Sequence, residues 1–279
     1  MTAVALLLPL ALLKASANAP AVQSLGPRSP AEVRRVVTLA PSLTDIVLEL
    51  GAGDRLVGVS RFDERPEVSK LPRVGGFVDP SIEAVLALKP DLLLVQPGPG
   101  NRRPVEALAE MGTPVLSLSL STVSDVLAAE RAIGRAVGRA EQGETLARRL
   151  EETRSRIRTR ARGTKAVRVL FVYGFDPLVV AGPGSFADEL LTDAGGINVA
   201  ADASSPYPLY SVERVILARP EVVVDGADVS SGRDQLRGLP GLKESRWVQL
   251  PDRSLLHPGP ALERGLVELF ALLHPGAGR

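Results

Sequence analysis

One segment occurs twice in this chain, and this repeat constrains the fold more than any other feature. Residues 81–95 read SIEAVLALKPDLLLV and residues 211–225 read SVERVILARPEVVVD, an offset of 211 − 81 = 130 positions in a chain of 279 residues. Each copy predicts a serine-capped helix, a break at a basic residue followed by proline, and a buried apolar strand. Two copies about half a chain apart predict two domains of the same build.

The segments around each copy alternate in the same way. RRVVTLA (34–40) and RLVGVS (55–60) are typical of short strands, with a helix predicted between them, and VRVLFVY (167–173) starts the pattern again. Near-continuous apolar strands that alternate with helices indicate a parallel sheet with helices on both faces. We therefore predict an N-terminal α/β lobe over 34–139 and a C-terminal α/β lobe over 166–276.

The segment between the lobes differs in composition. Residues 122–162 contain no proline and are rich in alanine, leucine, glutamate and arginine. This composition predicts a long connecting helix over 140–163, and its mixed charges are typical of a solvated face rather than of a nucleic-acid surface. The expected fold is α/β: two Rossmann-like lobes with parallel sheets, joined by one long rigid helix, with a ligand cleft between the lobes.

The N-terminus predicts export. An apolar run over 4–13 precedes alanine-rich residues, as in a signal peptide over 1–19, although the first residues carry no lysine or arginine. The run is too short for a membrane span, so we expect no stable membrane insertion. The chain has no cysteine, and we therefore expect a soluble periplasmic protein with a cleaved signal and no lipid anchor.

Several kinds of chemistry have no support in the sequence. There are 33 basic and 32 acidic residues, which gives no overall field for nucleic acid. The chain has no phosphate-binding glycine loop, no nucleophile elbow and only two histidines, so we expect no catalytic residues and no directly bound metal. An enzyme in the cleft, using scattered groups such as Asp63, Asp176 and His257, is the rival interpretation.

Half of the ten aromatic residues fall in predicted loops at the ends of strands. Ligands of open α/β sheets bind beyond the carboxyl ends of the strands, so these loops are expected to line the cleft. Aromatic side chains with a few polar groups suit a large, partly flat ligand. The candidate ligand-binding residues are Phe62, Phe77, Gln96, Phe175, Tyr207, Tyr210 and His257.

The repeat also places a glutamate at the same position in each copy, Glu83 and Glu213. A carboxylate in the first turn of a helix complements the helix dipole. A pseudo-symmetric protein that meets a symmetric dimer would also present the same charge twice. Position alone leaves both interpretations open.

These motifs together resemble a known family. RVVTLAPSLTDIVLELGAGDRLVGVS, VGGFVDPSIEAVLALKPDLLLV and YPLYSVERVILARPEVVV are similar to the periplasmic binding proteins that serve ABC importers of vitamin B12, iron–siderophores and haem. The resemblance covers the chain from about Arg34 onwards. It implies a monomeric, non-catalytic receptor without a cofactor, which clamps a metal chelate between two lobes and delivers it to a permease dimer through Glu83 and Glu213.

The resemblance is strongest to the vitamin B12 binders, which implies cobalamin or a related corrinoid as ligand. Phe62 and Phe77 match aromatic positions of that group, and Tyr207 and Tyr210 match another contact loop. Two loops depart from the group: the one with Gln96 lacks a tryptophan, and the His257 loop lacks an acidic–aromatic–basic run. Haem, with Tyr207, Tyr210 or His257 as axial ligand, and ferric siderophores are the alternatives.

Overall fold

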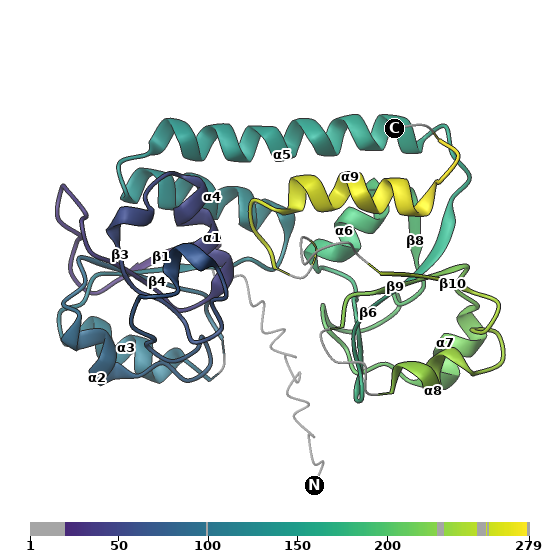
Figure 1. Cartoon of the computed structure of the whole chain (residues 1–279), viewed down its shortest axis with the longest axis horizontal. Helices are drawn as coiled ribbons and strands as arrows, with labels where there is room; N and C mark the ends of the chain where they lie inside the picture. The colour runs from purple at the N-terminus through teal and green to yellow at the C-terminus, as the bar shows by residue number, and fades with distance from the viewer. Residues whose placement is uncertain (1–19, 99, 228–231, 250–254, 256, 278–279) are drawn as a thin grey trace, which may run out of the picture.

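The computed structural model describes residues 20–98, 100–227, 232–249, 255 and 257–277. It is a two-lobe α/β fold, in which each lobe contains one mostly parallel sheet (Figure 1). The expected fold class is confirmed. The signal-peptide prediction over 1–19 lies outside the described residues.

The first lobe contains a sheet of order β1-β5-β4-β2-β3. Four strands are parallel: β2 (Val36–Thr38), β3 (Leu56–Gly58), β4 (Leu92–Val95) and β5 (Val115–Leu118). The helices of this lobe are α1 (Pro41–Glu49), α2 (Ile82–Ala87) and α3 (Arg102–Glu110), with 3-10 turns at Gly53–Arg55 and Pro66–Val68. β2, β3 and β4 are each followed by a crossover that returns to the sheet, as the alternation of the sequence predicted.

The second lobe repeats this strand order. Its parallel strands are β6 (Val167–Phe175), β8 (Gly196–Asn198), β9 (Val222–Asp225) and β10 (Arg246–Gln249). Across the sheet their order is β8-β6-β9-β10. The first lobe has the equivalent order β3-β2-β4-β5. The helices here are α6 (Phe186–Asp193), α7 (Val212–Ala218), α8 (Arg233–Arg237) and α9 (Leu262–Leu273).

Both sheets are mixed rather than purely parallel. In the first lobe, β1 (Val22–Leu25) pairs antiparallel with β5, although the sequence prediction started that lobe at residue 34. In the second lobe, β7 (Leu178–Val180) pairs antiparallel with the end of β6. Both strands are short, and each depends on pairing with a longer neighbour that local sequence patterns do not reveal.

The repeated segment takes the same conformation in both lobes. Ser81 and Ser211 cap α2 and α7 through their hydroxyls, each at 3.2 Å from a backbone nitrogen of the first turn. Each helix leads into a basic residue in the left-handed region, Lys89 at φ 44° and Arg219 at φ 46°. Proline follows both and disfavours a right-handed helical conformation at the residue before it. The repeat therefore encodes the same helix end twice.

An arginine at the start of the first parallel strand of each lobe, β2 or β6, anchors the helix end. Arg35 donates from Nη2 to the Leu88 carbonyl at 2.7 Å, and Arg168 donates from Nη2 to the Ala218 carbonyl at 2.5 Å. Positive charge at unpaired carbonyl groups is favourable at a helix C-terminus. The symmetry of the two lobes thus extends from the strand order to individual hydrogen bonds.

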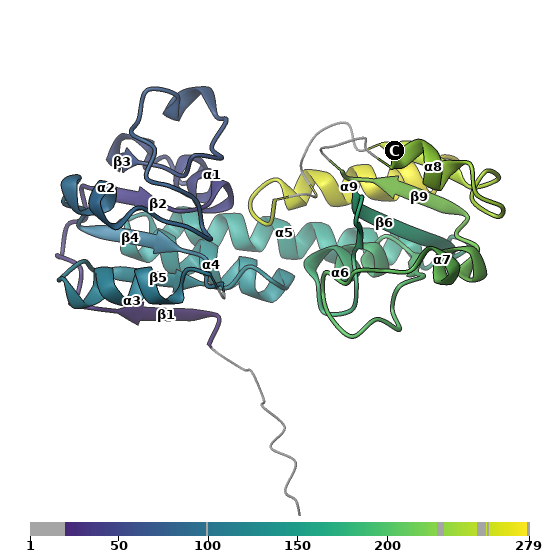
Figure 2. The same cartoon turned by 90° about the horizontal axis from the view of Figure 1, so that it is seen from below.

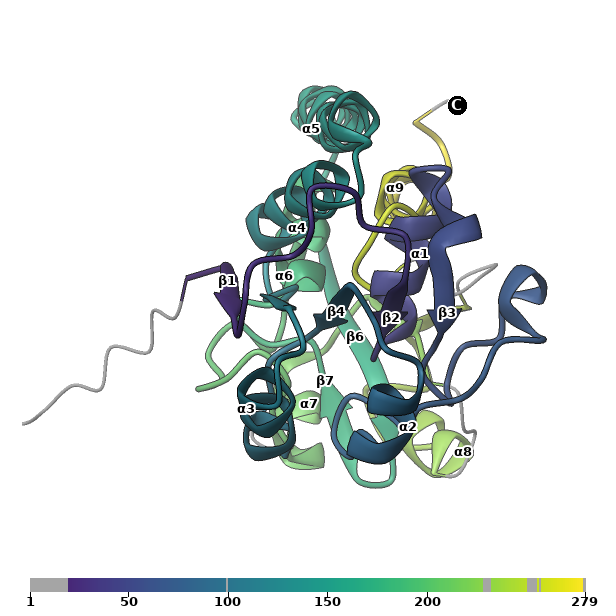
Figure 3. The ribbon, with the colours of Figure 1, turned by 90° about the vertical axis from the view of Figure 1, so that its left-hand side faces the viewer.

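The connecting helix α5 (Ala140–Ala161) runs above both lobes (Figures 1 and 2). It follows α4 (Val123–Ala136), and Figure 3 shows the two helices stacked above the first sheet. The two helices approach closely at Gly134 and Gly143, where neither residue has a side chain. A β-carbon at Gly143 would lie 2.7 Å from the carbonyl oxygen of Glu130, and one at Gly134 would lie 3.0 Å from the Gly143 Cα. Among the described residues, no helix is long and apolar enough to span a membrane.

One apolar core continues from the first lobe into the second. It contains Val36 and Leu94 of the first sheet, Leu150 and Ile157 of α5, and Phe171 of the second sheet. Helices α6 and α9 supply further buried residues. The lobes are therefore attached to one shared helical layer rather than linked only by a tether.

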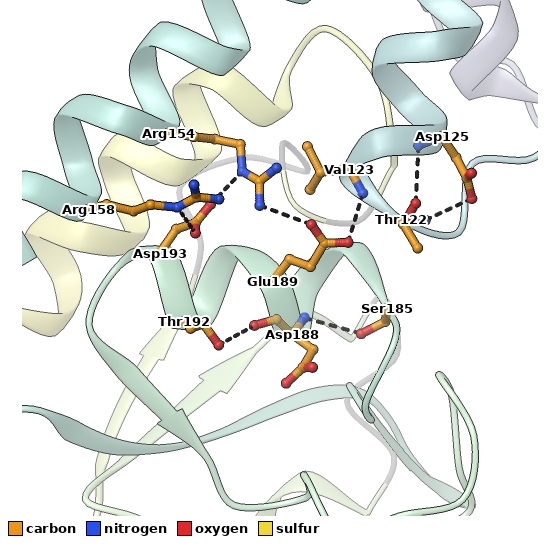
Figure 4. A network of polar contacts seen from close by, with 10 residues as sticks. All are labelled: Thr122, Val123, Asp125, Arg154, Arg158, Ser185, Asp188, Glu189, Thr192 and Asp193. Atoms are coloured by element: carbon orange, nitrogen blue, oxygen red, sulfur yellow. Dashed lines mark hydrogen bonds and ion pairs between the residues drawn. The ribbon is translucent and has the colours of Figure 1, made fainter. Parts of the chain in front are cut away.

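Ion pairs complete this attachment, as Figure 4 shows. The Arg154 side chain of α5, 14% exposed, bonds Asp193 at 2.5 Å and Glu189 at 2.9 Å, both on α6. The other oxygen of Glu189 accepts a hydrogen bond from the Val123 backbone nitrogen of α4 at 3.2 Å. A carboxylate of the second lobe thus caps a helix that packs on the first.

A buried carboxyl group in this helical layer predicts pH-dependent stability. Glu130 of α4 is 1% exposed, and burial raises its pKa to about 8. The folded state therefore favours the protonated acid, so its contribution is fully present below the unfolded pKa of about 4.3 and is lost as the pH rises through 8. We expect Glu130→Gln to raise the melting temperature by several degrees near pH 9 and to change it little near pH 4. Calorimetric melts at both pH values measure this.

Glu141→Gln, at an exposed position of α5, is the control for removing a carboxylate. If Glu130→Gln lowered the melting temperature equally at both pH values, burial of a neutral acid would not be the relevant feature.

Candidate ligand-binding site

The candidate site in the first lobe consists of two turns of the connection between β3 and α2, which carry Phe62 and Phe77, and of the loop after β4. Phe62 is 52% exposed and Phe77 is 37% exposed, so both rings present area to solvent. A β-carbon at Gly76 would lie 2.6 Å from the Phe62 ring, and one at Gly98 would lie 3.3 Å from the Phe77 ring. Each ring therefore lies over a glycine of a neighbouring loop, and the loops form one aromatic surface.

A buried asparagine that sequence reasoning missed holds two of these loops together. Asn101 is 2% exposed and donates from Nδ2 to the carbonyl oxygens of Phe77 at 2.5 Å and Gln96 at 2.7 Å. Its Oδ1 accepts a hydrogen bond from the Gly98 nitrogen at 3.0 Å. The predicted contact Gln96 is half-buried, and its backbone joins the Phe77 loop through Asn101. In the sequence, the only sign of this role is that Asn101 directly precedes the helix α3 in a glycine-rich loop.

The charges near the Phe62 ring are paired. Arg61 forms an ion pair with Asp79, and its guanidinium lies 5.2 Å from the centre of the Phe62 ring. The arginine that could attract an anionic ligand is thus compensated by a carboxylate of the adjacent loop. This surface is aromatic and close to neutral.

In the second lobe, Tyr207 is exposed, whereas two other predicted contacts are buried. Tyr207 is 45% exposed, whereas Phe175 is 8% and Tyr210 is 6% exposed, both in the core of that lobe. Phe175 stacks on Trp247 with ring centres 6.1 Å apart. The Tyr210 hydroxyl lies 3.1 Å from both the Val199 carbonyl and Asp202. Phe175 ends a strand and Tyr210 precedes a helix, so neither lies in an open loop, and we omit both from the proposed contacts.

Tyr207 has a second tyrosine behind it. The Tyr173 and Tyr207 rings meet edge to face, with centres 5.4 Å apart. The Tyr173 hydroxyl is buried and has no hydrogen-bond partner among the described residues. Burial raises the pKa of Tyr207 to about 12 and that of Tyr173 well above its ordinary value. The pair therefore presents a neutral aromatic surface.

His257 belongs to the second half of the chain but lies close to the first lobe. It is half-buried, and a β-carbon at Gly259 in the same loop would lie 3.5 Å from the Ser42 carbonyl of α1. Residues 250–254 and 256 lie outside the described part of the chain. Within that described part, no group of three or more acidic, histidine or cysteine side chains is arranged to hold a metal ion.

The two glutamates of the repeat lie at matching exposed positions. Glu83 and Glu213 occupy the first turns of α2 and α7, two residues after the capping serines. The backbone amide of Glu213 and the hydroxyl of Ser211 lower the pKa of the Glu213 carboxyl group. A hollow of about 780 Å³ lies beside α7, lined by Leu217, Arg219 and Pro240, and none of the candidate ligand residues contributes to it.

Known proteins with similar sequence and structure share this architecture. The model of a periplasmic binding protein family matches residues 36–248. The vitamin B12-binding protein of Pectobacterium carotovorum is 31% identical over 196 residues, which cover 69% of this chain and 71% of the relative. The apo haem-binding protein RhuT from Roseiflexus has a TM-score of 0.77 and 29% identity, with 88% of this chain and 100% of that chain covered.

A third similarity supports the fold. The vitamin B12-binding protein BtuF of Vibrio cholerae has a TM-score of 0.76, and the match covers 90% of this chain and 100% of that chain. Its identity is 24%, so it supports the two-lobe architecture and not a ligand.

The tyrosine environment can be tested directly. The chain has three tyrosines, at 173, 207 and 210, and burial is the main cause that raises the pKa of each. We expect the native protein to show little tyrosinate absorbance near pH 10, where free tyrosine is about half ionised. Unfolding in guanidinium should restore ordinary ionisation of all three. Tyr207→Phe should remove the group that titrates near 12, and ordinary titration of the native protein would contradict the burial of this pair.

Proposed function

Because this chain belongs to the periplasmic binding protein family, we propose that it is the substrate-binding protein of an ABC importer and that it captures cobalamin (vitamin B12) or a related corrinoid. The observation that carries the proposal is the pair of exposed phenylalanine rings, each held over a glycine, on loops at the strand ends of the first lobe. The 31% identical relative named vitamin B12-binding protein adds support.

The chemistry of this surface suits a corrinoid. A corrinoid offers a broad apolar face surrounded by amide groups, and aromatic rings on both sides provide area without charge. Phe62 and Phe77 would contact one side of the ligand and Tyr207 the other, across a cleft between the lobes. Gln96 and His257 lie in loops that can add polar contacts. The metal would stay bound within its own macrocycle, with no ligand from the protein.

Haem is the alternative that one relative supports, since RhuT is named a haem-binding protein. A tyrosine that binds ferric haem iron does so as a phenolate, and metal ligands must give up their proton. Burial raises the pKa of Tyr207 to about 12, which opposes that role. Haem and ferric siderophores also carry acidic groups, whereas Arg61 is already paired with Asp79. Both features favour the corrinoid.

We infer the remaining properties from the family and the sequence. The protein would be exported to the periplasm with removal of residues 1–19 and act as a monomer without a lipid anchor. It would bind rather than transform its ligand, as is usual for the substrate-binding protein of a transporter. Glu83 and Glu213 would dock on arginines of the two permease subunits, where carboxylate–guanidinium pairs supply directional bonds.

Ligand binding is tested by titrating the exported protein with cyanocobalamin, haemin and a ferric siderophore, with calorimetry and absorbance recorded together. We expect saturable one-to-one binding of cyanocobalamin. Phe62→Ala and Phe77→Ala should each weaken it by roughly threefold to tenfold through lost aromatic contact. Met111→Ala, at a 61% exposed position beyond the end of α3, is the control and should not change affinity. A shifted haemin spectrum without cobalamin binding would favour the haem alternative.

Docking is tested by charge reversal at both lobe tips, the first turns of α2 and α7 that carry Glu83 and Glu213. We expect the double variant Glu83→Arg with Glu213→Arg to abolish cobalamin uptake in cells while the purified protein keeps its ligand affinity. The loss arises because each new arginine would repel an arginine of the permease. Glu141→Arg with Glu152→Arg, both exposed on α5, changes the net charge equally and should leave uptake intact. Uptake that survives reversal at the tips would assign the glutamates to helix stabilisation alone.

A further inference from the structure

The turn that carries Phe62 contains a buried acid that the ligand contacts leave unexplained. Asp63 is 5% exposed, although the residues on either side of it are exposed. Neither of its carboxyl oxygens has a hydrogen-bond partner within the described part of the chain. A buried carboxyl group without full compensation is costly, and such groups persist where they serve a site.

The surroundings of Asp63 are hydroxyl groups from three separate elements. Thr38 ends β2 and Thr44 lies on α1, and their hydroxyl oxygens are 2.6 Å apart. Ser60, just after β3, is fully buried, as are both threonines. The hydroxyls of Thr44 and Ser60 oppose the rise in the pKa of Asp63 that burial causes. The acid thus lies where the ends of two strands and the start of a helix meet.

The backbone of the same turn is bonded to this polar cluster. The Phe62 nitrogen donates to the Ser60 hydroxyl at 3.0 Å, and the Asp63 nitrogen donates to the Ser60 carbonyl at 3.2 Å. The Arg61 nitrogen donates to the Gly75 carbonyl at 2.8 Å, which joins the turn to the loop beneath the Phe62 ring. The Ser60 hydroxyl thus connects the Phe62 backbone to the polar cluster around Asp63.

We propose that Asp63 is a positioning residue for the ligand site: its carboxylate, buried beside the hydroxyl groups of Ser60 and Thr44, orients the Ser60 hydroxyl and so holds the turn over 60–63 in the conformation that presents the Phe62 ring. The inference rests on the proposed function for the part of its test that uses ligand. It assigns Asp63 no contact with the ligand. Its role is to keep the Ser60 hydroxyl oriented as the acceptor for the Phe62 nitrogen.

Two measurements on the exported protein test this role. Asp63→Asn should increase hydrogen exchange at the Phe62 amide about tenfold or more, whether or not a ligand binds. Asp54→Asn, an exposed acid at the opposite end of β3, is the control and should leave that exchange unchanged. In titrations with cyanocobalamin, Asp63→Asn should weaken binding about tenfold in the native background and about twofold or less in the Phe62→Ala background.

The pH dependence separates positioning from general support. The charged groups near Asp63 are Arg73, whose Nη1 donates to the Ser60 carbonyl at 3.3 Å, and Asp45, whose own partner is Arg65. Affinity of the native protein should fall at acid pH as Asp63 gains its proton, and Asp63→Asn should flatten that fall. Asp45→Asn removes the other nearby acid and should retain it.

The outcomes are distinct. Equal loss of affinity from Asp63→Asn in both backgrounds, or unchanged exchange at the Phe62 amide, would overturn the positioning role. If the native protein bound no cyanocobalamin, the proposed ligand would be wrong, and the exchange measurement would still decide the role of Asp63 in the turn. If Asp63→Asn failed to fold, Asp63→Ser would supply a smaller polar group for the same comparison.

Discussion

The relative position of the two lobes depends on a buried ion-pair cluster at α5. The Arg154 guanidinium bridges Asp193 and Glu189, and Glu189 in turn accepts from the backbone at the start of α4 (Figure 4). Buried pairs of this kind add little net stability, but removing one partner leaves an uncompensated charge, so they specify one arrangement. The cluster lies beside the continuous apolar core that α4, α5, α6 and α9 form. Apolar burial supplies the attraction, and the ion pairs select the geometry.

The two lobes share a repeated framework but differ in the aromatic surfaces at their strand ends. The lobes repeat the strand order, the serine caps, the left-handed helix ends and the arginine anchors at matching positions. Glu83 and Glu213 lie within this repeated geometry. The candidate surfaces at the strand ends differ, with phenylalanines over glycines in one lobe and, in the other, Tyr207 edge to face with Tyr173 of β6. A symmetric permease dimer would require equal docking surfaces on the two lobes, whereas an asymmetric ligand would require unequal contact surfaces. A repeated framework whose candidate-site loops differ would satisfy both requirements.

The sequence predicted those parts of the fold that local pattern determines. The repeat located α2 and α7 with their caps, because a serine, an apolar period and a basic–proline break act within one segment. It did not reveal β1, since VQSL becomes a strand only by pairing with β5 from almost a hundred residues later. Nor did it separate Tyr207 from Tyr210. Three positions apart in one segment, one is exposed and the other buried under a helix start, and that depends on tertiary packing.

The candidate site shows the same division. Exposed aromatic side chains in loops were visible in the sequence, but the residues that hold those loops were not. Asn101 and Asp63 are polar, buried and remote in sequence from part of what they support, so neither periodicity nor composition distinguishes them from surface residues. Their roles follow only from the loops that the fold brings together. Polar groups that position a site are for this reason the last part of a function that sequence alone reveals.

The shared core has a consequence for how such a receptor releases its ligand. A bilobed protein with a flexible hinge can open by rotating its lobes, and it loses only the contacts between them. Here α5 packs against both lobes, and opening would strain the burial of residues such as Leu150 and Ile157 together with the Arg154 cluster. The aromatic surfaces are therefore largely preorganised, which favours affinity, because little ordering accompanies binding. The same rigidity would oppose release, and under the proposed docking the free energy that separates the lobes would come from contacts of Glu83 and Glu213 with the permease.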